Sequence, residues 1–173
     1  IYLGDRFGVR TPMQWNMNIN AGFSTANPQK LFLPIITDPM YRHESINVAT
    51  QEENPSSQLW WIRNLLSMRK RLGVFGKGSL QFIESSNSKV LCFARTYEKE
   101  NIIVVANLSQ FSQATTLDLK SFKDCDITEV FSQNRFMSVG DGEYSITVGP
   151  YGYFWFQADV SEKKEQGNNS NEL

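Results

Sequence analysis

VLCFARTYEKENIIVVAN, residues 90–107, is the stretch that decides the fold. Two runs rich in β-branched and aromatic residues, 90–96 and 102–107, flank the polar stretch Glu-Lys-Glu-Asn at 98–101. A polar stretch of this kind can reverse the chain without burying unsatisfied backbone groups. The pattern therefore predicts two antiparallel strands joined by a short turn.

Similar short runs continue on both sides of this pair. Turn-forming residues at 85–87 and 140–142 separate some of them. Strands spaced in this way are typical of an antiparallel β-sandwich, which we expect between residues 76 and 160. The other expected strands are 80–83, 115–119, 127–131, 144–148 and 153–156.

Upstream of the strands, residues 58–72 carry apolar side chains at helical spacing and predict an amphipathic helix. The residues that share its apolar face are Trp61, Leu65, Met68 and Leu72. Asn54 or Ser56 is the expected N-terminal cap, and Gly73 is the expected stop.

Residues 1–57 contain too many helix and strand breakers for long regular elements, so we expect one long, ordered loop. The breakers are Pro12, Pro28, Pro34, Pro39 and Pro55, with scattered Gly and Asn. A loop of this length in a compact domain is uncommon and usually functional. It indicates both that the loop builds a site and that a neighbouring part of the protein is absent.

Composition excludes several classes of partner. Forty per cent of the 173 residues are hydrophobic, which is enough for a packed core. The net charge of −1 gives no support for binding to nucleic acid or to an anionic membrane, and no run approaches the length of a membrane span. Cys92 and Cys125, without motif spacing, favour a reducing compartment, and we expect the cytoplasm.

Two motifs in the N-terminal part resemble a known family. GDRFGVRTPMQW at residues 4–15 is followed by NAGFS at 20–24. Together they resemble the stretch after the eighth barrel strand in glycoside hydrolase family 13 of the α-amylase superfamily. There, an Arg-Thr-Pro-Met-Gln-Trp run marks the branch of the oligo-1,6-glucosidases and trehalose synthases. The sequences of segments 27–31 and 54–57 resemble those of the trehalose synthases.

This resemblance implies a mainly β fold, in which an antiparallel β-sandwich follows the last piece of a (β/α)8 barrel. Residues 1–75 would be the end of the catalytic barrel, comprising the loop after strand 8 and the last helix. Residues 76–160 would be the C-terminal β-sandwich. Residues 161–173, which have one apolar side chain, read as a disordered tail.

The resemblance also implies a parent enzyme that interconverts maltose and trehalose by intramolecular transglucosylation with retention. The catalytic Asp, Glu and second Asp of this family belong to earlier barrel strands, so we expect no catalytic residue here and an inactive fragment. No cofactor is expected, although a calcium ion is possible upstream. The barrel would be the main packing partner, and an oligomer is possible.

Arg10 is the first candidate for substrate binding. A guanidinium offers several fixed donors to sugar hydroxyls and can keep a neighbouring carboxylate ionised. Arg6 and Asp5 follow as loop braces or acceptor-site contacts. The alternative for all three is a salt bridge that braces the loop. Gln14 and Trp15 could contact sugar, but a structural role for them is favoured.

Two other functions stay open. The shared Thr-Pro-Met-Gln-Trp run at residues 11–15 also fits an α-glucosidase or oligo-1,6-glucosidase. A function of another class would make residues 76–160 a non-catalytic sandwich that binds glucan or stabilises the barrel. Its support is the aromatic terminal strand with Tyr153, Phe154, Trp155 and Phe156, although alternation favours core packing for these rings.

Overall fold

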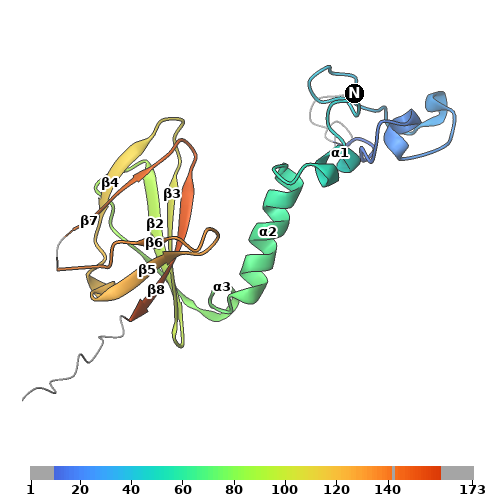
Figure 1. Ribbon diagram of the computed structural model, residues 1–173. Coiled ribbons are helices and arrows are strands. Elements are labelled where there is room, and N and C mark those ends of the chain that lie inside the picture. Colours follow the sequence, from blue (N-terminus) through green and yellow to red (C-terminus); the bar gives the residue numbers. More distant parts are fainter. Residues whose placement is uncertain (1–9, 142, 161–173) are drawn as a thin grey trace, which may run out of the picture. The chain divides into compact units, whose positions relative to one another are not determined.

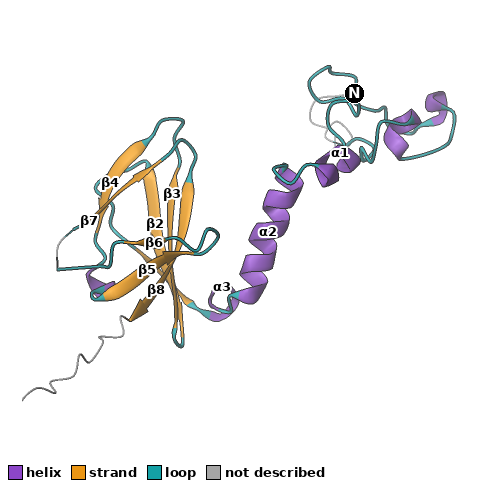
Figure 2. Ribbon diagram, viewed as in Figure 1, coloured by secondary structure: helices purple, strands orange, loops and turns teal. Residues whose placement is uncertain are grey.

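The computed structural model describes residues 10–141 and 143–160. The chain divides into two compact units, Ile1–Met68 and Arg69–Leu173. The described part of the first unit consists of loops and helices, whereas every described strand belongs to the second unit (Figure 2). This mainly β architecture with antiparallel strands confirms the fold class that the sequence predicts.

Short helices interrupt the segment that we expected to be one loop. They are η2 (Ile19–Gly22), η3 (Pro28–Lys30) and α1 (Val48–Glu53). α1 lies in the proline-free stretch between Pro39 and Pro55, where Asn47 caps it by accepting a hydrogen bond from the Thr50 amide at 2.9 Å. The expectation of an uninterrupted loop was therefore wrong at these three places.

The predicted long helix is present as α2 (Gln58–Arg71). Its cap differs from the prediction, because Ser57 Oγ accepts from the Trp60 amide at 3.4 Å while Asn54 caps only the preceding turn. α2 ends at Arg71, close to the predicted stop at Gly73, but Gly73 has an ordinary right-handed φ of −59° and leads into the short helix α3 (Val74–Lys77).

The second unit is an antiparallel sandwich (Figure 1). The larger sheet has the order β1-β2-β3-β8-β5-β6, and β4 pairs with β7 in the smaller sheet. The strands are β1 (Ser79–Phe82), β2 (Val90–Tyr97), β3 (Glu100–Asn107), β4 (Gln113–Leu117), β5 (Cys125–Glu129), β6 (Arg135–Phe136), β7 (Tyr144–Val148) and β8 (Tyr153–Val160).

Alternation along β8 separates two apolar faces of the larger sheet. Phe156 is 1% exposed and lies in the sandwich core, where its ring centroid is 4.9 Å from that of Phe136. Trp155 points to the opposite face and packs against Phe75 at 4.6 Å and Phe131 at 5.2 Å. The prediction that these rings pack in the core thus holds for Phe156 and, in part, for Phe154, whereas Trp155 packs outside the core on the opposite face.

The two cysteines are free and buried in the sandwich core. Burial raises the pKa of Cys92 to about 12, and burial together with nearby aspartates raises the pKa of Cys125. Both thiols therefore stay protonated near neutral pH and act as small apolar side chains.

The strand predictions err most at β8, which runs to Val160 and thus four residues beyond the predicted end at 156, and around β5. β5 ends at Glu129, two residues before the predicted end, because the Glu129 carboxylate accepts hydrogen bonds from the amides of Phe131 at 3.0 Å and Ser132 at 2.6 Å. These bonds turn the chain and bring Arg135–Phe136 back as β6, which was missed because it is too short to show alternation.

Two charged side chains of the sheet hold α3. Glu100 Oε2 accepts from the Val74 amide at 2.9 Å, at the N-terminus of α3. Arg95 donates to the carbonyls of Val74 and Phe75 in the helix and of Gly78 directly after it, at 3.3, 3.2 and 2.8 Å. A carboxylate at the first end and a guanidinium at the second end match the partial charges of the exposed helix termini.

Replacement of Arg95 should destabilise the sandwich unit. We expect Arg95→Met to lower the free energy of unfolding by about 1 to 3 kcal/mol, because three carbonyls lose a charged donor. Urea unfolding followed by circular dichroism measures this. Lys99→Met, at an exposed cation of the adjacent turn, is the control. Equal effects of the two substitutions would contradict the role of Arg95.

Candidate functional site

Arg10 lies at the edge of a hollow of about 540 Å³. The other residues that line this hollow are Thr11, Pro12, Phe23, Leu31, Phe32 and Leu33. Arg10 is exposed, and no ion pair joins it to a residue within 10–141 or 143–160. Its guanidinium is thus the one charged group on an otherwise largely apolar lining. Arg6 and Asp5, the other two candidates, lie outside the described residues.

Gln14 ties two distant parts of the first unit together. Its side-chain Nε2 donates to the carbonyl of Tyr41 at 3.1 Å and to that of Ile46 at 2.6 Å. Its backbone carbonyl accepts from the Val48 amide at 2.9 Å, and the Trp15 carbonyl accepts from the Ala49 amide at 3.0 Å. Gln14 therefore has the structural role that was favoured for it, and it fixes the start of α1 beside the motif.

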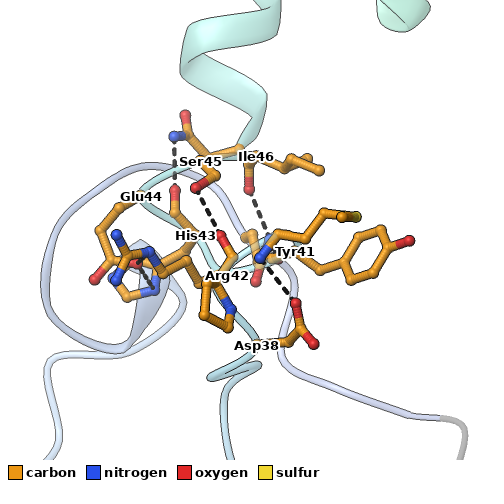
Figure 3. Close-up of polar contacts among 11 residues, drawn as sticks. Asp38, Tyr41, Arg42, His43, Glu44, Ser45 and Ile46 are labelled. Carbon is orange, nitrogen blue, oxygen red and sulfur yellow. Dashed lines mark hydrogen bonds and ion pairs between the residues drawn. The ribbon is translucent and has the colours of Figure 1, made fainter.

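The segment that Gln14 holds is itself a compact set of turns (Figure 3). The Asp38 carboxylate accepts from the Met40 amide at 2.8 Å, and Ser45 Oγ donates to the Pro39 carbonyl at 3.2 Å. His43 is buried, and its Nδ1 lies 3.4 Å from Glu44 Oε2. His43 is thus a buried residue of the turns.

A left-handed turn connects the motif to Phe23. Asn20, Ala21 and Gly22 have φ values of 55°, 60° and 69°. The Ala21 carbonyl accepts from the amides of Trp15 at 2.8 Å and Asn16 at 3.2 Å, while Asn20 Nδ2 donates to the carbonyls of Ser24 and Ala26. The φ of 69° favours glycine at position 22, where a Cβ would also lie 2.4 Å from the Asn16 amide oxygen and displace that side chain.

Together these contacts brace the first part of the chain, and the hollow on it is lined by the exposed guanidinium of Arg10 and by two exposed aromatic rings, Phe23 and Phe32. Such a lining can donate hydrogen bonds to hydroxyls and cover an apolar ring face. Within the described ranges, no group of three or more His, Cys, Asp or Glu side chains is placed to hold a metal ion. No helix of the described chain is long and apolar enough to cross a membrane.

The sequence reasoning found Arg10 but missed Phe23 and Phe32 as lining residues. Phe23 belongs to the quoted NAGFS motif, which was used only as a family mark. Phe32 gave no signal, since a lone aromatic residue in a loop has no periodicity. Only the path of the chain brings both rings to Arg10.

Comparison with known families divides the chain in two. Residues 4–78 match the α-amylase catalytic domain, and residues 80–155 match the C-terminal domain of maltogenic amylase. The trehalulose synthase MutB from Pseudomonas mesoacidophila MX-45 is a structural neighbour, with a TM-score of 0.66 and 27% identity. The match covers 87% of this chain and 25% of the MutB chain. The chain belongs to the α-amylase superfamily, glycoside hydrolase family 13.

Within this family the chain is a homologue of trehalose synthases. The trehalose synthase of Pimelobacter sp. (strain R48) is 41% identical over 161 residues, which are 91% of this chain and 28% of the relative. The oligo-1,6-glucosidase of Bacillus cereus is 30% identical over 87% of this chain and 25% of its own length. The chain thus spans about a quarter of the length of these relatives.

Loss of the Gln14 amide should loosen the segment between Asp38 and Asn47. We expect Gln14→Leu to speed amide hydrogen exchange there by roughly tenfold, because two carbonyls lose their donor at a cost of about 1 to 2 kcal/mol. Exchange followed by mass spectrometry tests this. Gln29→Leu, at an exposed glutamine of η3, should leave the rate unchanged. Equal protection in Gln14→Leu and the wild type would contradict the brace.

Proposed function

We propose that this chain is the C-terminal part of a trehalose synthase that interconverts maltose and trehalose. The observation that supports this most directly is the 41% identity to a trehalose synthase, which extends over 91% of the chain and thus over both units. A glucosidase relative is less similar over a comparable stretch. The chemistry belongs to the parent enzyme, and the chain alone is inactive.

The proposed reaction keeps the configuration of the transferred glucose. An upstream Asp attacks the anomeric carbon of maltose, while an upstream Glu protonates the leaving glucose oxygen. The released glucose stays in the closed site and presents its anomeric hydroxyl. The same Glu then removes the proton from that hydroxyl, whose oxygen attacks the anomeric carbon as the Asp leaves. Two inversions give retention.

In this proposal residues 1–75 complete the catalytic barrel, and residues 76–160 are the supporting sandwich. Matches to the two family domains at 4–78 and 80–155 support the division. The barrel is the main packing partner. Trp61 and Leu66 of α2 support this, since they are 44% and 52% exposed within the described chain and would be covered by further barrel elements. The free, buried cysteines favour a cytoplasmic location.

Arg10 is proposed to bind the substrate from the rim of the pocket. Its exposed guanidinium beside an apolar hollow supports this, because loops after barrel strands line the active face. Arg6 and Asp5 are proposed as further contacts or braces on the motif that carries Arg10.

The second candidate function is that of an oligo-1,6-glucosidase, favoured by the 30% identity to the Bacillus cereus relative. The sandwich gives less support for a glucan-binding role. One hollow of the sandwich, of about 470 Å³, is lined mainly by acidic and hydroxyl side chains without a described aromatic ring, and the one that Phe82 and Phe122 line measures only about 180 Å³.

Incubation of the full-length parent with maltose tests the function. We expect trehalose as the main product with glucose as a minor one, quantified by chromatography. Arg10→Ala should lower kcat/KM for maltose by roughly 10- to 100-fold, because one or two charged hydrogen bonds are lost. Arg42→Ala, at an exposed arginine of the same unit, is the control. Glucose without trehalose would refute the synthase and favour the glucosidase.

A further inference from the structure

The hollow beside Arg10 has a lining that suits a sugar ring. One guanidinium and one hydroxyl, from Arg10 and Thr11, lie among five apolar residues in a volume of about 540 Å³. This volume is in the range of small-molecule sites. A pyranose has a polar rim of hydroxyls and apolar faces of C–H groups, so a lining of aromatic rings with a few donors is complementary to it.

Two rings dominate the apolar part of this lining. Phe32 is 83% exposed and Phe23 is 53% exposed, although both are large apolar side chains. Phe23 also lines a second hollow of about 780 Å³, whose polar residues are Asn16, Asn18, Ser24 and Thr25. Phe23 therefore belongs both to the hollow that holds Arg10 and to one rich in amides and hydroxyls.

The backbone that presents Phe23 is strained. Asn20 and Ala21 adopt the left-handed conformation, which costs a non-glycine residue roughly 1 kcal/mol or more. Ala21 is fully buried, and the Phe23 amide is bonded to the Asn20 carbonyl at 3.0 Å. Such strain persists where the surrounding contacts over-determine it and is often found at ligand sites. Here its result is a fixed position for an exposed ring.

We infer that Phe23 and Phe32 form the apolar wall of the site that holds the released glucose beside Arg10, and that this wall limits the entry of water. This inference rests on the proposed function. The glucosyl-enzyme has two competing acceptors: attack by the glucose hydroxyl yields trehalose, whereas attack by water yields a second glucose. In both cases the C–O bond to the enzyme carboxylate breaks and the Glu takes the acceptor's proton.

Removal of a ring opens space that water fills. It should therefore raise the rate of hydrolysis relative to transfer, with little effect on the formation of the glucosyl-enzyme. The rings thus determine the product and do not take part in bond breaking. The competing explanation is that they merely pack against the barrel, which would change stability and leave the product ratio unaltered.

The test measures the ratio of glucose to trehalose formed from maltose by the full-length enzyme. We expect Phe32→Ala and Phe23→Ala each to raise this ratio by roughly fivefold or more. Such a rise needs only a small change in the activation barrier for attack by water relative to that for attack by the glucose hydroxyl. Phe32→Leu, which keeps an apolar wall, should stay close to the wild type. Tyr41→Ala is the matched control, because Tyr41 is a 55% exposed ring of the same unit outside both hollows.

Thermal unfolding of each variant separates packing from selectivity. If Phe32→Ala does not fold, the ratio in Phe32→Ser and Phe23→Ala, compared with Phe32→Leu, decides instead. An unchanged ratio in folded variants of an enzyme that forms trehalose would overturn this inference alone, as would an equal rise in Tyr41→Ala. A wild type that forms only glucose would overturn the proposed function and this inference with it.

Discussion

The first unit depends on the hydrogen bonds of one side-chain amide, that of Gln14. Its Nε2 bonds to the carbonyls of Tyr41 and Ile46, which are 27 and 32 residues away in the chain. Backbone hydrogen bonds close the individual turns of this segment, and the Gln14 side chain adds the donors that satisfy these two carbonyls. With this brace, the motif, the turns and the start of α1 form one framework that presents Arg10.

The sandwich depends on a different constraint, namely a large sheet that is apolar on both faces. One face of β8 fills the core with Phe156, while Trp155 on the other face packs against Phe75 of α3. Arg95 and Glu100 then hold both ends of α3 by hydrogen bonds. These contacts fix α3 to the large sheet within the second unit.

Sequence periodicity predicted most of the regular structure. Alternation placed β7 at its observed bounds, and helical spacing placed α2 to within one residue at its end. The prediction failed where one side chain redirects the backbone. Glu129 ends β5 early, and Asn47 starts α1 within an expected loop. Such local bonds compete with periodicity and leave no repeating signal.

The sequence by itself determined the family, the strands and helix, and Arg10 as a candidate contact, because motifs and alternation are local properties of the chain. Only the tertiary structure decided that Gln14 is a brace, that Trp155 packs outside the core, and that Phe23 and Phe32 line the hollow at Arg10. The physical reason is that these contacts join residues far apart in the chain. Their partners are set by the path of the folded backbone, which neither propensity nor spacing specifies.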